Sequence, residues 1–407
     1  MDTRPASGAL PLLAVVLTAL NLRTAVTGFT PLLDVVGDDL GFGPSLYGVL
    51  GTVVTACFAV FGLLGAGAGR RLGLERALAL ATACTTAGIV LRALSPTTTV
   101  LVVSTVLALT GVGASNVLVI PLVKRYFAER LKLVSSMYIA LLQVGQFVAP
   151  LLAVPVALAV GWRWAVGMWA VLTGVAVVLW VVLAARGGAT AAPAVTATNA
   201  APPRLDGAWR TPLLWSMVLM MGMTGLNVYA IITWLPAVLV DAGADPASGG
   251  ALLALFSVFG LPAAFVVPPL AMRLRNPFVV VAVCAACMAG GYLGLLLSPG
   301  TAAAAWVVLL GVGVSTFPLC LALVNVRTRT TAGSTVLSGA MQGVGYGIAC
   351  LGPLGIGLLY TATGTWTASL LVLVASLVVL VAAGVVACRP AALEDQVAER
   401  TPVLVGV

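Results

Sequence analysis

Long runs of apolar residues fill this chain and constrain its fold more than any other feature. A helix needs roughly 20 apolar residues to cross the hydrocarbon core of a bilayer. Charged residues make up 8% of the 407 positions and hydrophobic residues 61%, whereas a soluble domain carries about 25% charged residues. We therefore predict an all-α integral membrane protein with twelve transmembrane helices. The predicted spans are residues 10–33, 46–69, 75–95, 98–121, 133–157, 164–185, 212–240, 248–271, 278–298, 302–326, 334–358 and 366–388.

One long polar interval divides the twelve spans into six and six. Residues 186–211 are rich in Ala, Pro, Thr and Gly, a composition typical of a flexible linker. The predicted organisation is an N-terminal six-helix bundle (1–185), a cytoplasmic linker (186–211), a C-terminal six-helix bundle (212–390) and a cytoplasmic tail (391–407).

The positions of the basic residues predict the orientation. With the N-terminus in the cytoplasm, 17 of the 20 Lys and Arg residues fall in cytoplasmic loops and tails, and only Arg23, Arg92 and Arg163 do not. This is the asymmetry that the positive-inside rule describes. We expect a multi-pass protein of the inner (plasma) membrane with both termini cytoplasmic. The net charge of +8 is then a consequence of topology, and no nucleic-acid partner is expected.

The absence of histidine narrows the possible chemistry. The chain contains no His, which excludes imidazole metal sites, Ser-His-Asp triads and imidazole proton relays. Its seven cysteines all lie in apolar stretches, where we interpret them as packing residues. No catalytic residue, metal or cofactor is expected. An integral-membrane enzyme is a rival hypothesis, but it would need acids, histidines or metal ligands clustered near a membrane face.

The two halves repeat each other. Polar, proline and glycine positions of segment 21–37 recur in segment 227–243 with spacings that agree within one residue, and a second match pairs 143–150 with 342–353. A parallel repeat displaced by about 200 residues is expected of two bundles related by an axis along the membrane normal.

Several segments resemble one transporter family. They are L-N-L-R-T-A (20–25), R-R-L-G-L-E-R-A-L (70–78), W-L-P-A-V-L-V-D-A-G (234–243), S-G-A-M-Q-G-V-G-Y (338–346) and T-G-T-W-T-A (363–368). With these the chain resembles the major facilitator superfamily, and within it the cyanate-permease-like and 2-nitroimidazole-transporter-like branch. The resemblance implies two six-helix bundles related by a pseudo-two-fold axis and alternating access about a central cavity.

Two departures limit what the resemblance implies. The loop before the third span holds Arg70 where the superfamily usually has an acid, so the gating salt bridge of that acid cannot be transferred. The fifth span has Gly145, Ala149 and Pro150, only part of the glycine-proline motif that is common in antiporters.

Arg23 is the most informative single residue. It lies midway through an apolar span, where a central arginine costs roughly 2.5–3.5 kcal/mol on insertion scales and usually faces a cavity or a partner. In a continuous helix Arg23, Thr27, Thr30 and Asp34 would share one stripe. Arg23 either contacts an anionic or polar substrate, or is structural and bonds to backbone carbonyls or toward Asp34.

The repeat extends this candidate site to the second bundle. Tyr229 and Thr233 occupy the positions that match Arg23 and Thr27, and Trp234 follows them. Glutamines in the fifth and eleventh spans form polar faces that meet either a ligand or each other, whereas Asn21, Asn227, Asn116 and Asn325 are interpreted as structural. The predicted substrate-binding residues are Arg23, Thr27, Gln143, Gln146, Tyr229, Thr233, Trp234, Gln342 and Tyr346.

The predicted function is secondary active or facilitative transport of a small anion or a small polar heteroaromatic solute. Every acid lies in a loop, at a helix end or in a tail, so Asp34 is the acid nearest the site that could couple transport to protons. Alternatives are a drug or metabolite efflux antiporter of the same fold and a transport-inactive membrane receptor. The expected partners are a small-molecule substrate and the lipid bilayer, and we expect a monomer.

Overall fold

The computed structural model describes residues 8–187 and 207–400. These residues form helices joined by short turns, with no strand among them. Twelve helical segments are long and apolar enough to cross a membrane, which confirms the predicted all-α, twelve-span fold. The central part of the predicted linker, 188–206, lies outside the described residues.

The first six spans begin and end close to the predicted limits. They are α1 (Ala9–Thr27) with η1 (Thr30–Leu32) and α2 (Leu33–Leu40), α3 (Pro44–Leu72), α4 (Leu74–Ala93), α5 (Thr98–Tyr126), α6 (Leu131–Val160), and α7 (Trp162–Gly167) with α8 (Trp169–Gly187).

The second six spans are more often interrupted by short breaks. They are α9 (Pro212–Asp241), α10 (Pro246–Val258) with α11 (Gly260–Arg273), α12 (Phe278–Leu297), α13 (Ala303–Gly313) with α14 (Thr316–Val326), α15 (Thr331–Ala349) with α16 (Leu351–Thr363), and α17 (Trp366–Ala387). The short helices η2 (Ala128–Arg130), η3 (Ala208–Arg210) and α18 (Leu393–Arg400) lie outside these spans.

The helix ends follow local sequence signals. Thr97, Thr211, Asp245 and Thr330 each precede a helix and accept a hydrogen bond from the backbone N–H three residues later, as N-cap residues do. Glycine ends α16, where Gly364 adopts a φ of 67°, a left-handed conformation that suits this residue.

The first span is broken, which corrects the expectation of a continuous helix from 10 to 33. Helix α1 ends at Thr27, and the chain passes through Gly28 and η1 before α2 begins. Pro31 lies inside η1, and proline has no N–H with which to continue an α-helix. The polar stripe inferred for Arg23, Thr27, Thr30 and Asp34 assumes a continuous α-helix, and that assumption does not hold beyond Thr27.

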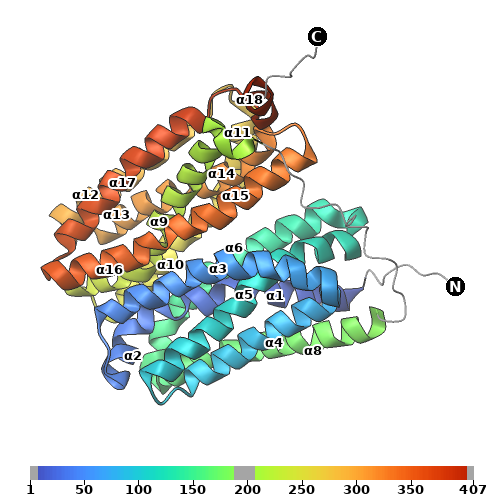
Figure 1. Ribbon diagram of the computed structural model, residues 1–407. Helices are drawn as coiled ribbons and strands as arrows, with labels where there is room; N and C mark the ends of the chain where they lie inside the picture. Colours follow the sequence, from blue (N-terminus) through green and yellow to red (C-terminus); the bar gives the residue numbers. More distant parts are fainter. Residues whose placement is uncertain (1–7, 188–206, 401–407) are drawn as a thin grey trace, which may run out of the picture.

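The two sets of six spans lie side by side along a central interface (Figure 1). The second span, α3, packs on the eleventh, α15 and α16, while the fifth, α6, packs on the eighth, α10 and α11. In the repeat, the second span corresponds to the eighth and the fifth span to the eleventh. The two contacts are therefore equivalent, and a pseudo-two-fold axis relates them. The division at residues 185 and 212 itself stays a proposal.

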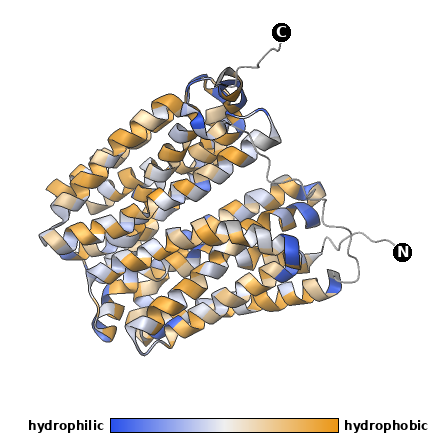
Figure 2. Ribbon diagram, viewed as in Figure 1, coloured by the Kyte–Doolittle hydropathy of each residue, from blue (hydrophilic) through white to orange (hydrophobic). Residues whose placement is uncertain are grey.

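Charge distinguishes the two ends of the molecule, which Figure 2 shows as polar helix ends on an apolar body. We call the end that carries Arg70, Arg71, Lys124 and Arg125 the basic end. The opposite end, which we call the acidic end, carries Asp34, Asp38, Asp39, Asp241 and Asp245.

An ion pair joins the third and fourth spans at the basic end. Glu75, in the first turn of α4, accepts a hydrogen bond from Tyr126 at 3.0 Å and pairs with Arg125 at 2.9 Å. Both partners lie at the end of α5, so the pair fastens α4 to α5.

The expected cytoplasmic tail contains a docked helix, α18. Gln396 accepts a hydrogen bond from the N–H of Leu213 at 3.1 Å, and Asp395 pairs with Arg329 at 2.9 Å. The carboxylate of Glu394 accepts hydrogen bonds from the N–H groups of Arg329 and Thr330 and from the Thr330 hydroxyl. Helix α18 is therefore held at the beginnings of α9 and α15.

Candidate functional site

Arg23 lies in a cluster of tyrosines between the two bundles. Its guanidinium interacts with the hydroxyl of Tyr229, on α9, and the side chains of Tyr346, on α15, and Tyr138, on α6, are close enough to act on its charge. The two bundles thus contribute hydroxyl groups to one arginine. Hydroxyls can donate or accept, so this cluster can orient the arginine and also bind a solute beside it.

An aromatic wall adjoins the cluster. Phe58, on α3, lies 5.9 Å from Tyr346 and 6.3 Å from Tyr229 between ring centroids, and the two tyrosines are 6.2 Å apart. All three rings meet edge to face, a preferred geometry for aromatic pairs. Each of them is buried, so the wall is firm.

The charge of Arg23 is not neutralised by an acid. None of the ion pairs among the described residues involves Arg23, and its buried Nε has no hydrogen-bond partner. A charge inside a membrane protein is costly unless it is paired or faces water or a ligand. The site is therefore suited to a solute that brings negative charge or hydrogen-bond acceptors.

A cavity of about 470 Å³ extends from this wall toward the basic end. Phe58 and Tyr346 form its inner limit, and the remaining lining is neutral. The lining residues are Phe58, Ala59, Gly62, Gly113, Asn116, Val117, Val324, Asn325, Ser334, Thr335, Ser338, Gly339, Gln342, Gly343 and Tyr346.

Two asparagines outside the predicted set also line the cavity. The sequence interpretation gives Asn116 and Asn325 a structural role, because they lie nearer the cytoplasmic ends of their spans. In the structure both line the cavity, from α5 and α14.

The glutamines predicted on α6 and α15 separate into two groups. Gln342 is exposed to the cavity and lies one helical turn before Tyr346 on α15. Its amide donates to the hydroxyl of Ser338 at 3.1 Å. Gln143 instead lies against α11, where a Cβ on Gly260 would clash with its Nε2. Gln146 is partly exposed on the same helix, α6.

Trp234 lies in a closed layer at the acidic end and does not line the cavity. It is 2% exposed and donates from Nε1 to the carbonyl oxygen of Pro353 at 2.9 Å. Its ring lies 6.0 Å from Tyr47 of the first bundle and 5.5 Å from Trp366. Trp366 and Tyr360 both donate to Asp241, so aromatic rings from both bundles close this end.

Glycines allow the closed layer to form. A Cβ on Gly48 would lie 2.8 Å from the Pro353 carbonyl oxygen, and one on Gly51 would overlap Thr233 Oγ1. Gly357 meets Trp234 in the same way, at 2.6 Å. Helices α3 and α16 therefore approach backbone to backbone where the two bundles touch.

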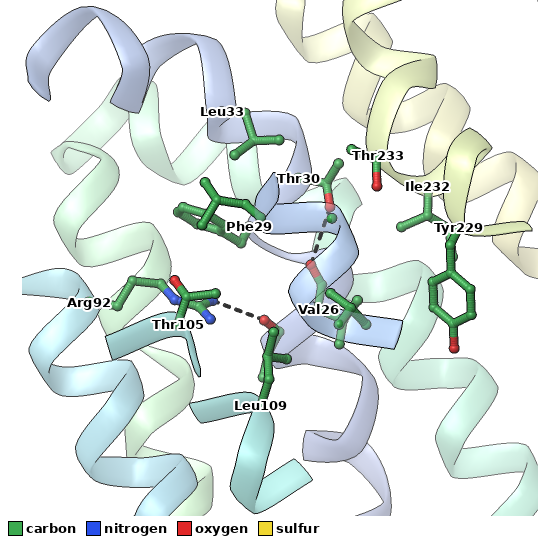
Figure 3. Close-up of a pocket in the computed structure, with 14 residues that line it drawn as sticks. Val26, Phe29, Thr30, Leu33, Arg92, Thr105, Leu109, Tyr229, Ile232 and Thr233 are labelled. Atoms are coloured by element: carbon green, nitrogen blue, oxygen red, sulfur yellow. Dashed lines mark hydrogen bonds between the residues drawn. The ribbon is translucent and has the colours of Figure 1, made fainter. Parts of the chain in front are cut away.

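The remaining predicted residues lie outside the Arg23 cluster. Thr27 donates to the carbonyl oxygen of Arg23 at 3.1 Å and is buried. Thr233 lines a second, much smaller cavity of about 20 Å³ together with Tyr229, Thr30 and Arg92 (Figure 3). Asp34 interacts with Tyr47 at the acidic end, on the far side of the closed layer.

Asn227 ties neighbouring helices together, whereas the hydrogen bond of Asn21 stays within α1. Asn227 donates to Ser376 at 2.9 Å and to its own helix, and accepts from Tyr292 at 2.8 Å. Asn21 accepts from Thr24 at 3.1 Å. The described residues contain no group of three acidic, His or Cys side chains that could hold a metal ion.

Known proteins with similar sequences are transporters. Residues 13–353 match the Major Facilitator Superfamily. The chain is 30% identical over 359 residues to the 2-nitroimidazole transporter of Escherichia coli (strain K12), covering 88% of this chain and 90% of that protein. It is 27% identical over 361 residues to the cyanate transport protein CynX of the same organism, covering 87% and 91%. It is also 29% identical over 374 residues to the uncharacterized transporter YycB of Bacillus subtilis (strain 168), covering 91% of each.

Solved structures share the fold at lower sequence identity. A point mutant of the nucleoside transporter NupG superposes with a TM-score of 0.73 at 13% identity, covering 92% of this chain and 99% of that one. A bacterial homolog of the human lysosomal transporter Spinster, in an inward-facing and occupied conformation, gives a TM-score of 0.69 at 14% identity, with 98% of each chain covered.

Proposed function

This chain belongs to the Major Facilitator Superfamily, and from that premise we propose that it carries a small anion or a small, flat, polar heteroaromatic solute across the membrane. The family and the named relatives point to a membrane transporter rather than an enzyme. The proposed substrate class goes further and rests on the Arg23 cluster.

The observation that carries the proposal is a guanidinium among tyrosines without an acid. Arg23 has no carboxylate partner among the described residues, while Tyr229, Tyr346 and Tyr138 surround it with hydroxyl groups. A guanidinium presents its N–H donors in a planar fork that fits an anion or two acceptors of one ring. The rings of Phe58 and Tyr346, which meet edge to face, offer apolar surface near that fork.

Both named relatives fit this chemistry in different ways. Cyanate is a small anion, and 2-nitroimidazole is a flat ring with polar substituents; these are the solutes in the names of two relatives. A guanidinium beside aromatic rings can bind either class. We therefore propose the class of substrate and not one compound.

We propose alternating access as the transport mechanism. Solute would enter the 470 Å³ cavity and bind at Arg23 while the aromatic layer at Trp234 keeps the acidic end closed. Rocking of the two bundles about the cluster would then open the acidic end and close the cavity. The positive-inside rule places the basic end in the cytoplasm, so the described conformation would be inward-facing in the inner membrane.

Transport in proteoliposomes tests the role of Arg23. We expect Arg23→Ala to abolish or strongly reduce flux of small anions and nitroimidazole-like rings, and Arg23→Lys to restore only part of it, because an ammonium cannot form the planar fork. Arg163→Ala is a matched control, since it removes a positive charge from an exposed ion pair with Asp39 at the acidic end. A folded Arg23→Ala protein with unchanged rate and affinity would contradict the proposal.

A further inference from the structure

Arg92 is a buried cation at the break in the first span. It is 2% exposed, and its Nη1 donates to the carbonyl oxygen of Ala25 at 3.0 Å. Its guanidinium also lies over the ring of Phe29, 4.7 Å from the centroid. Figure 3 shows the side chain reaching from α4 to the end of α1. This contact satisfies a carbonyl that the broken helix leaves free, but it uses only one of the guanidinium nitrogens.

Arg92 lines a small cavity together with a residue that carries a second unpartnered donor. Arg92 Nε and Nη2 and Trp169 Nε1 are buried and have no hydrogen-bond partner. Both side chains line one cavity of about 10 Å³, which we call the arginine pocket. Its lining residues are Thr24, Ala25, Gly28, Phe29, Ile89, Arg92, Val166 and Trp169.

A glycine keeps the arginine pocket open. A Cβ at Gly28 would lie 2.8 Å from the carbonyl oxygen of Thr24 and 3.2 Å from Trp169 Nε1. Any larger residue would therefore occupy the space in front of the indole N–H. Because Gly28 also lies where α1 ends, the helix break and the pocket are parts of one local arrangement.

Charge determines which guest fits the pocket. Arginine and the indole N–H can only donate hydrogen bonds, so the guest must accept from both. No ion pair among the described residues involves Arg92, and an isolated buried charge is far more costly than a buried neutral donor. A water molecule would satisfy the donors but would leave the charge uncompensated.

We propose that the arginine pocket binds a resident halide-sized monoanion, such as chloride, between Arg92 and Trp169. A cavity of about 10 Å³ has room for one guest about the size of a water molecule, and a monatomic halide is the smallest class of monoanion. The anion would neutralise Arg92 and fasten the break in α1 to α4 and α8. Arg23 and Tyr229 do not line this pocket, and the proposal does not depend on the identity of the transported solute.

Thermal unfolding of the purified full chain tests the proposal. The protein is kept in gluconate at constant ionic strength while chloride or bromide is titrated in, and Tm is measured. We expect Tm to rise with the logarithm of the halide concentration once that concentration exceeds Kd. Trp169→Phe removes one donor and keeps the ring, so the halide concentration at which the rise begins should increase about tenfold. Arg92→Gln should lose the rise.

Trp180→Phe is the matched control on the same helix. Its indole Nε1 already donates to the hydroxyl of Thr18 at 2.9 Å, so the substitution should lower the starting Tm and leave the halide dependence unchanged. Arg23→Gln should also keep the dependence. A Tm that ignores halide in the wild type, an unchanged response in Trp169→Phe, or a response lost in Arg23→Gln would each overturn the proposal.

Anomalous diffraction from crystals grown in bromide gives a direct test. We expect a bromide peak within hydrogen-bond distance of both Arg92 and Trp169. Density at that position without anomalous signal would identify a water molecule and overturn the proposal.

Discussion

Gly51 offers the sharpest test of how the acidic end is closed. A Cβ at this position would overlap Thr233 Oγ1 and would lie 2.7 Å from Thr233 Cγ2 and 2.9 Å from Pro353 Cβ. Real Cβ atoms do not approach other atoms so closely, so Gly51→Ala must push α3 away from the second bundle. We expect the substitution to weaken the closed layer.

The size of the effect follows from the cost of overpacking. Extra atoms in a well-packed interface cost about 1–3 kcal/mol. The contact exists only while the acidic end is closed, so this cost falls on one conformation. We expect the equilibrium to move toward a conformation with the acidic end open by about 5- to 150-fold.

Spin labels across the closed layer can measure this shift. The hydroxyls of Ser45 and Thr361 lie 3.2 Å apart on α3 and α16, and both side chains are exposed. With labels at these two positions in a cysteine-free background, Gly51→Ala should increase the population of long distances. The control is Gly355→Ala on α16, where a Cβ would meet no atom within 4 Å.

A second substitution isolates the clash. Thr233→Ala removes the two atoms nearest to the added Cβ, so in combination with Gly51→Ala it should recover part of the short-distance population. A folded Gly51→Ala protein with the wild-type distance distribution would refute the reasoning. If long distances persist equally in the double variant, the clash with Thr233 is not the cause of the opening.

Three further predictions concern the site, the coupling and the C-terminal helix. Tyr346→Phe keeps the ring but removes a hydroxyl beside Arg23, so solute affinity should fall about tenfold in binding assays while Tm changes little; an unchanged affinity would separate this hydroxyl from the site. Dissipating the proton gradient should leave equilibrating flux of a non-ionising solute unchanged, and Asp34→Asn should not alter this; gradient-driven accumulation that is lost in Asp34→Asn would show proton coupling. Partial burial alone would raise the pKa of Glu394, but the hydrogen bonds from Arg329 and Thr330 lower it below its ordinary value. The docking of α18 is therefore fully stable above the ordinary pKa range of a glutamate and weakens as pH falls through the lowered pKa. The protection of residues 393–400 against hydrogen exchange, relative to the intrinsic rate at each pH, should fall in acid, and this fall should be absent in Glu394→Gln.

The fold could be predicted because lipid imposes one simple requirement. Every spanning segment must satisfy its backbone N–H and C=O groups internally, as a helix does, and must be apolar over about 20 residues. The apolar runs that meet this requirement are visible in the sequence. The grouping of Arg23 with Tyr229 and Tyr346 follows from the internal repeat, because matched positions on matched helices meet near a shared axis.

Other features depend on how helices bend and cross, which periodicity does not record. The break at Gly28 moves Asp34 away from the stripe that contains Arg23 and Thr27. The crossing of α3 with α16 places Trp234 in the closed layer, because glycines let the two backbones touch there. These positions could be found only once neighbouring helices were in place.

Arg92 shows a different limit of sequence reasoning. In the sequence it is one of three basic residues that do not follow the positive-inside rule. The structure gives it a role at the broken end of α1. Signals that could have found it are the G-F-T-P segment at 28–31, which favours a helix break, and the general need of a free helix end for a cation.

The attachment of α18 has a practical consequence. Besides its contacts with Leu213, Arg329 and Thr330, α18 donates from the N–H of Leu393 to the carbonyl oxygen of Arg327 at 2.9 Å. All four partners lie within the second bundle. If that bundle tilts during turnover, α18 tilts with it at the basic end, where the cavity lies. Energy transfer between a dye on α18 and another at the basic end of α5 would then report the distance between the two bundles during turnover, without a label in the solute pathway.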